Sequence, residues 1–254
     1  MADTIDVFGE YAPAYTISNE NQHWITKAVS GTSRVLTVTG SGDQALFYHL
    51  RGVKQIDTFD ITYNARVIQD IKFAAIKALP YLEYSNLLID LYYSADMPKI
   101  PAMQKILPLL PQKTIQVIKT PGNKNIFGAG LDARQYPHNI PSPKEYKKLQ
   151  KTLKKPFSFI RCDLYDLSAK ISGTYDLINI SNIFDYCYDS KAQAQILQNL
   201  TPHLNIGGHI AYIPQASRYI YENVSVETKD GALKYEKTLE RKRGEKMILF
   251  QRTR

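Results

Sequence analysis

Short apolar segments recur along the chain and alternate with segments whose apolar residues repeat at helical spacing. Five apolar segments predict strands, at residues 35–39, 55–59, 157–161, 175–180 and 209–214. Helices are predicted between them, at residues 43–50, 64–79 and 191–204, the last ending at Gly207-Gly208. Alternating strands and helices indicate a mainly parallel α/β sheet that binds ligands at the carboxyl ends of its strands.

Two regions depart from this alternation. Residues 81–156 contain nine prolines, short helices predicted at 87–92 and 103–110, a glycine turn at 125–130, and a basic helix predicted at 142–153. We expect this insertion to form a substrate wall, because long irregular insertions are usually functional. Residues 234–241 and 246–252 predict an antiparallel hairpin that completes a seven-stranded sheet. The domain therefore spans 34–254, preceded by a cap segment at 1–33.

Composition narrows the class of protein. The 254 residues contain no apolar run long enough to cross a bilayer, and Cys162 and Cys187 form no CxxC pair. The start, Met1-Ala2-Asp3, does not resemble a secretory signal, so a cytoplasmic location is expected. The five histidines have no metal-ligand spacing, and no metal site is expected.

The net charge of +8 indicates an anionic partner or surface. Lys and Arg are frequent in the C-terminal hairpin, where they alternate with apolar residues, so a solvated hairpin is favoured over contact with nucleic acid. Peripheral membrane contact stays open, nucleic acid is not expected as a partner, and the sequence leaves the oligomeric state undefined.

The most informative motif joins a strand, a glycine turn, a helix and an acid. Gly40 and Gly42 follow the first strand, and Asp60 ends the second, where a ribose-binding acid is placed in nucleotide-binding sheets. Asp163 follows the third strand, at the position that contacts adenine. The turn lacks a third glycine, which favours a single adenosine over a dinucleotide. A tight turn without a ligand and an NAD-dependent oxidoreductase remain alternatives.

These motifs resemble those of class I S-adenosylmethionine (SAM)-dependent methyltransferases. The segment from Leu200 to Ile210, with its pair Gly207-Gly208, is similar to the turn that precedes the fifth strand of that family. The resemblance implies a Rossmann-like fold and SAM as cofactor. It also implies that Gly40 and Gly42 lie under the cofactor, that Asp60 binds the ribose and that Asp163 contacts adenine.

A narrower resemblance is to the SAM:diacylglycerol 3-amino-3-carboxypropyltransferases of betaine-lipid synthesis. Two of the features that carry it are the acid Asp43 after the glycine pair and the insertion with Gly128 and Gly130. The other two are the helical segment Asp70-Ile71-Lys72-Phe73-Ala74-Ala75-Ile76 and the segment after the fourth strand, Ser181-Asn182-Ile183-Phe184-Asp185-Tyr186. It implies aminocarboxypropyl transfer to a small-molecule or lipid acceptor. Methyl transfer and a non-catalytic binding protein are the alternatives.

The candidate site residues follow from these motifs. Asp185 is the candidate base, or else an acid at a helix N-terminus that accepts from backbone donors. Tyr186 and Asn182 are candidate positioning groups beside the fourth strand, and Ser181 is a candidate cofactor contact. Asp43 binds the cofactor's amino group or caps its own helix.

Overall fold

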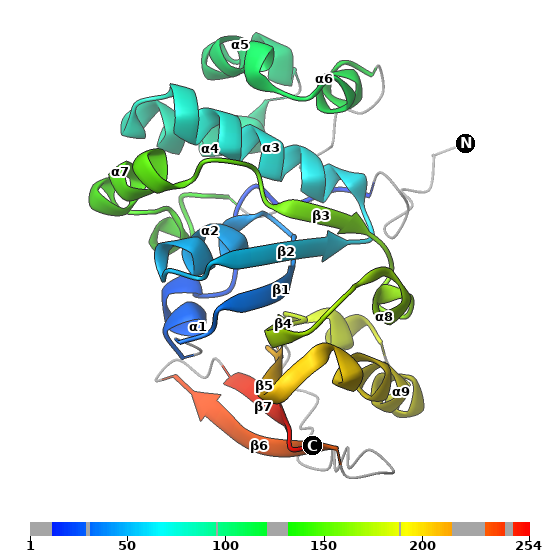
Figure 1. Cartoon of the computed structure of the whole chain (residues 1–254). Coiled ribbons are helices and arrows are strands. Elements are labelled where there is room, and N and C mark those ends of the chain that lie inside the picture. Colours follow the sequence, from blue (N-terminus) through cyan, green and yellow to red (C-terminus); the bar gives the residue numbers. More distant parts are fainter. Residues whose placement is uncertain are drawn as a thin grey trace.

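A computed structural model of the chain describes residues 12–28, 31–94, 96–120, 132–187, 189–214, 232–241 and 246–254. Its centre is one seven-stranded sheet with the order β3-β2-β1-β4-β5-β7-β6 (Figure 1). The strands are β1 (Arg34–Val38), β2 (Gln55–Asp60), β3 (Ser158–Arg161), β4 (Tyr175–Asn179), β5 (Leu204–Tyr212), β6 (Leu233–Glu240) and β7 (Lys246–Arg252). β1 to β5 pair in parallel, and β7 runs antiparallel between β5 and β6. This is the expected Rossmann-like sheet of the class I methyltransferase type, with its C-terminal antiparallel hairpin.

Alternating side chains of the central strands build two separate cores. On β1, Val35 packs with Tyr48 of the helix that follows it, whereas Leu36 packs with Leu197 on the opposite face. On β4, Leu177 and Ile178 divide in the same way. Successive residues of a strand point to opposite faces, so a strand with both faces covered is apolar throughout. This explains why the central strands appear in the sequence as continuous apolar segments.

Helices cover both faces of the sheet, with α1 and α2 on one side and α8 and α9 on the other (Figure 1). The α-helices are α1 (Gln22–Ala28), α2 (Asp43–Leu50), α3 (Tyr63–Ala78), α4 (Tyr81–Tyr93), α5 (Pro101–Ile106), α6 (Gln112–Lys119), α7 (Pro143–Thr152), α8 (Leu167–Lys170) and α9 (Ser190–Leu200). The 3₁₀ helices are η1 (Met97–Lys99), η2 (Leu107–Leu109), η3 (Pro137–Asn139), η4 (Ile183–Tyr186) and η5 (Thr201–His203). No helix of the described segments is both long and apolar enough to span a membrane.

The insertion forms a helical layer against α3 (Figure 1). The helix expected at 87–92 is the second half of the longer α4, because Pro80 ends one helix and immediately precedes the next. The Tyr146 hydroxyl of α7 donates to the carbonyls of Ala75 and Leu79, at 3.1 and 2.9 Å. α7 therefore anchors the end of α3. The glycine turn expected at 125–130 lies outside the described residues.

The last predicted helix is too long. α9 ends at Leu200, Thr201–His203 form a 3₁₀ turn, and β5 already begins at Leu204. Pro202 has no amide hydrogen and cannot continue the α-helical hydrogen bonding. The glycine pair therefore lies inside β5 rather than before it. A Cβ on Gly208 would lie 2.9 to 3.1 Å from three carbonyl oxygens, where β4 and β5 shift register.

Candidate functional site

A cavity of about 640 Å³ opens at the carboxyl ends of the parallel strands. Small-molecule sites in proteins measure about 300–1,000 Å³, so the size suits a cofactor. β1 and β4 are neighbours in the sheet, and the helices that follow them, α2 and α9, lie on opposite faces of it (Figure 1). Sheets of this kind bind ligands at such a point, where the strand order reverses. The described lining residues come from segments 12–20, 38–44, 59–65, 162–165 and 181–187, together with Ile196.

The turn after β1 is fixed by backbone conformation and by Asp60. Gly40 and Gly42 have φ angles of +48° and +79°, in the left-handed region where glycine avoids the steric cost of a side chain. The amide of Gly40 donates to Asp60 Oδ2 at 2.9 Å, and that of Thr62 donates to Oδ1 at 3.2 Å. Both carboxylate oxygens keep room for another donor, because a carboxylate offers about four acceptor positions.

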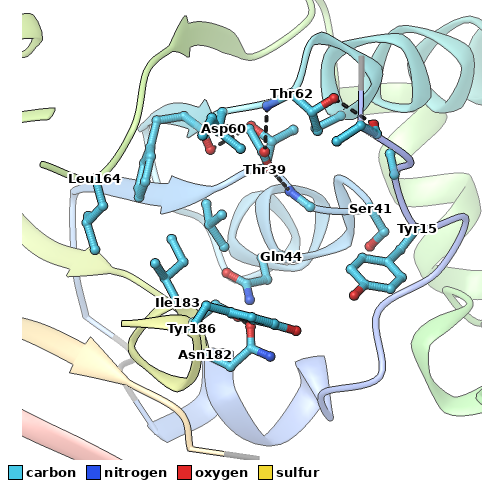
Figure 2. A pocket seen from close by; sticks show the side chains of 18 of the residues that line it. Tyr15, Thr39, Ser41, Gln44, Asp60, Thr62, Leu164, Asn182, Ile183 and Tyr186 are labelled. Atoms are coloured by element: carbon cyan, nitrogen blue, oxygen red, sulfur yellow. Dashed lines mark hydrogen bonds between the residues drawn. The ribbon is translucent and has the colours of Figure 1, made fainter. Parts of the chain in front are cut away.

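Burial raises the pKa of Asp60 to about 6, and the backbone donors at Gly40 and Thr62 offset only part of this shift. The carboxyl lines the cavity together with Thr39 and Thr62, which surround it in Figure 2. A buried acid without a cationic partner is stabilised in its charged form when a ligand donates hydrogen bonds to it.

Two of the other strand ends bring Asp163, Ser181, Asn182 and Tyr186 to the same cavity. Asp163 follows β3 and accepts the amide of Tyr165 at 2.9 Å. Asn182 and Tyr186 lie across the cavity from Asp60 in Figure 2, with Gln44 between the two sides. The predicted residues Gly40, Asp60, Asp163, Ser181, Asn182 and Tyr186 thus meet around one space.

Three predicted residues do not reach it. The carboxylate of Asp43 is fully buried, where it accepts from the Ser18 amide and the Ser41 hydroxyl, both at 2.8 Å, and pairs closely with Lys72. Gly42 lies behind the turn, against Gln69. The candidate base Asp185 lies on η4, outside the cavity lining, and its carboxylate accepts from the Tyr212 hydroxyl.

Glu20 lines the cavity, although the sequence did not single it out. Its two oxygens accept from Gln44 Nε2, at 2.6 Å, and from the Ser181 hydroxyl. Burial raises its pKa to about 7, and these donors oppose the shift. The only sequence signal is an acid in the polar run Ser18-Asn19-Glu20-Asn21, which matches no motif spacing.

No described residue of the insertion lines the cavity. The insertion reaches the site indirectly through Asn139, whose side chain is fully buried. Asn139 Nδ2 donates to the carbonyls of Ser18 and Glu20, at 2.6 and 2.7 Å, and Asn139 Oδ1 accepts the amide of Gln22 at 3.1 Å. Asn139 thus holds the N-terminal segment over the strand ends.

The described part of the cavity lining is acidic. It contains Glu20, Asp60 and Asp163, and it contains no Lys, Arg or His. Three tyrosines, Tyr15, Tyr165 and Tyr186, are partly exposed at its rim. Burial and the nearby Tyr186 hydroxyl raise the pKa of Tyr15 to about 12. Among the described residues, no group of His, Cys, Asp or Glu could hold a metal ion.

No family model and no curated protein matches this sequence. Solved structures with similarity over most of the chain include methyltransferases. The rRNA methyltransferase aviRa from Streptomyces viridochromogenes is 14% identical, with a TM-score of 0.48 over 91% of this chain and 82% of that one.

The N-methyltransferase NodS from Bradyrhizobium japonicum WM9 is 10% identical, with a TM-score of 0.42 over 92% of this chain and 93% of that one. NodS in complex with S-adenosyl-l-homocysteine gives a TM-score of 0.43 at 10% identity, over 91% of this chain and 83% of that one. At these values the similarities assign no cofactor, substrate or activity to this chain.

Proposed function

We propose that this chain is a SAM-dependent group transferase. One observation carries the proposal: the partly buried Asp60 carboxylate, which accepts from the amide of Gly40, faces a cavity shared by the ends of β1, β2, β3 and β4. A ribose diol supplies two hydroxyl donors, which suit a partly buried carboxylate that has no cationic partner among the residues that the structure describes.

The remaining lining suits an adenosine sulfonium. Asp163 lies one strand away from Asp60 and is proposed to accept from the adenine amino group, and Gly40 lets the backbone approach the ligand closely. The acidic lining attracts a positively charged sulfonium and disfavours a phosphate-rich dinucleotide. These features support an adenosine cofactor over NAD.

When bound, SAM supplies a carbon whose bond to the sulfonium sulfur breaks readily, because the sulfur leaves as a neutral thioether. The protein therefore mainly has to orient the acceptor in line with one C–S bond. Asn182 and Tyr186 follow β4 and line the cavity, and they are proposed to position the acceptor. Asp185 accepts from Tyr212 and is proposed to hold η4, which carries Tyr186, in place.

The transferred group is proposed on two grounds. Resemblance to the aminocarboxypropyltransferases assigns the 3-amino-3-carboxypropyl group. Methyl transfer is the second candidate. The resemblance to the aminocarboxypropyltransferases rests in part on Asp43, but Asp43 pairs with Lys72 and does not face the cavity, which weakens the case for aminocarboxypropyl transfer and favours methyl transfer. Either transfer uses the same adenosine contacts.

The acceptor is proposed to be a small molecule or a lipid, and RNA is an alternative to be tested beside them. The purified chain is incubated with SAM and, separately, with a pool of amines, with diacylglycerol vesicles and with total RNA. S-adenosylhomocysteine as by-product indicates methyl transfer, and methylthioadenosine indicates aminocarboxypropyl transfer. Asp60→Ala is the negative control, and Asp90→Asn on the exposed face of α4 is the matched control.

We expect one by-product with the wild-type chain and with Asp90→Asn, and a strong loss with Asp60→Ala. SAM binding without either by-product, from any acceptor pool, would favour the non-catalytic alternative. Absence of SAM binding would contradict the proposed function itself.

A further inference from the structure

Glu20 lies at the carboxyl ends of the paired strands β1 and β4. Its side chain is 6% exposed and lines the cavity. One oxygen accepts from Ser181, directly beyond β4, and the other accepts from Gln44 in the first turn of α2. The carboxyl is therefore fixed from both sides of the crevice in which sheets of this type bind ligands.

The backbone at Ser181 is strained in a way that supports this geometry. Ser181 has a φ of +51°, in the left-handed region that a residue with a side chain seldom adopts. Its amide donates to Asn179 Oδ1 at 2.8 Å, and its carbonyl accepts the amide of Ile213 at 2.8 Å. Such strain persists only where the surroundings impose it, and it concentrates at ligand sites. Here it directs the Ser181 hydroxyl to Glu20.

The charges of the described residues around Glu20 favour a cation over an anion. The other carboxyls of the described lining are Asp60 and Asp163, and no described lining residue is basic. Among the residues that the structure describes, Asp185 on η4 and Tyr48 on α2 interact electrostatically with Glu20 from neighbouring elements, and neither supplies a positive charge. A phosphate or carboxylate acceptor would meet like charges here, whereas an ammonium group would be stabilised.

We propose that Glu20 binds the ammonium group of the acceptor at the point of transfer and takes a proton from it, so that the acceptor is an amine. This inference rests on the proposed function. The ammonium loses one proton to the Glu20 carboxylate. The freed nitrogen lone pair forms the new N–C bond to the carbon on sulfur, the C–S bond breaks, and its electron pair stays on sulfur, which becomes a neutral thioether. Glu20 then passes its proton to water.

The pKa of Glu20, raised to about 7, suits this role, because a base works best when its pKa is close to the working pH. Burial is the main cause of the shift, and Asp185 adds to it. Below this pKa the carboxyl is protonated and attracts an ammonium group less.

The test compares two ligands that share the adenosine and the amino acid arm. S-adenosylhomocysteine has a neutral thioether at the transfer point, whereas sinefungin carries an ammonium group there. Affinities of both are measured by calorimetry for the wild-type chain, for Glu20→Gln and for Glu240→Gln. The last variant removes an exposed acid on β6, away from the cavity lining. Glutamine at position 20 can still accept from Gln44 and donate to Ser181, and thermal unfolding checks that the variant is folded.

We expect Glu20→Gln to lower the affinity for sinefungin about tenfold or more, because it removes a charge-assisted hydrogen bond. The affinity for S-adenosylhomocysteine should change less than about threefold. In the wild-type chain the preference for sinefungin should decline as the pH falls below about 7, and Glu20→Gln should show no such decline. The ratio of the two affinities cancels the titration of Asp60, which both ligands share.

Equal weakening of both ligands would place Glu20 at the amino acid arm of the cofactor and overturn the inference. An unchanged preference for sinefungin would overturn it as well. A wild-type chain that binds neither ligand would instead contradict the proposed function.

Discussion

Gly40 donates its backbone amide to the Asp60 carboxylate at 2.9 Å, which joins the turn after β1 to the end of β2. The contact fixes the acid beside the backbone that is proposed to lie under the cofactor. Burial raises the pKa of Asp60 to about 6, because the amides of Gly40 and Thr62 stabilise the charged form only in part, and further donors would stabilise it more. The hydroxyls of a ribose diol are proposed to supply these additional donors.

Replacing Asp60 with alanine should remove the proposed ribose contact. Two hydrogen bonds to a charged group are worth about 1.5–3 kcal/mol each, and water replaces part of this, so SAM affinity should fall about 10- to 100-fold. Calorimetric titration measures the effect, with Asp90→Asn as control. Wild-type affinity in Asp60→Ala would disprove the ribose assignment.

Binding of S-adenosylhomocysteine should depend on pH through Asp60. The carboxyl is protonated below its pKa of about 6 and then accepts fewer hydrogen bonds, so affinity should be about tenfold weaker at pH 5 than at pH 7.5. Asp60→Asn should flatten this profile.

The stability of the ligand-free chain should also depend on pH through Asp60. Because the pKa of Asp60 is raised in the folded state, the free energy of unfolding should fall as the pH rises from 3.8 to about 6. A salt-bridged acid, whose folded-state pKa is lowered, has the opposite effect.

The Asp43–Lys72 pair should be structural. Both side chains are at most 1% exposed, so Lys72→Met leaves a buried carboxylate without its cation and should cost about 3–5 kcal/mol of unfolding free energy. Lys77→Met, at an exposed position of the same helix, should change it by less than about 0.5 kcal/mol. Denaturant unfolding distinguishes the two. A small effect of Lys72→Met would show that the pair contributes little to stability.

Asn139 should couple the insertion to the site. Asn139→Ala removes three buried hydrogen bonds to the segment that carries Glu20 and should lower the free energy of unfolding by about 1–3 kcal/mol. It should also weaken the preference for sinefungin, because Glu20 is no longer held in place. A stability loss with an unchanged ligand preference would limit Asn139 to a structural role.

Local patterns made the sheet and part of the cavity lining predictable. The apolar strands, the turn at Gly40 and Gly42, and the acid Asp60 are recognisable because each depends on residues close in sequence. The end of α9 was misplaced because the glycine pair resembles a turn, whereas Gly208 serves the close approach of β4 and β5 inside a strand.

The rest of the site depends on contacts between distant residues. Glu20 reaches Ser181 across 161 positions of the chain, and no spacing rule connects them. Asp43 was expected to face a ligand or to cap its helix, but Lys72, 29 positions later, pairs with it in the core. Folding decides which acids face the cavity, and the sequence pattern alone does not encode this choice.

A crystal structure of the chain grown with saturating S-adenosylhomocysteine would show directly whether the cavity binds the adenosine. We expect the adenosine in the cavity, with the ribose hydroxyls within hydrogen-bond distance of the Asp60 carboxylate and the adenine beside Asp163. Density for the ligand elsewhere, or a cavity that stays free of it at saturation, would contradict the account.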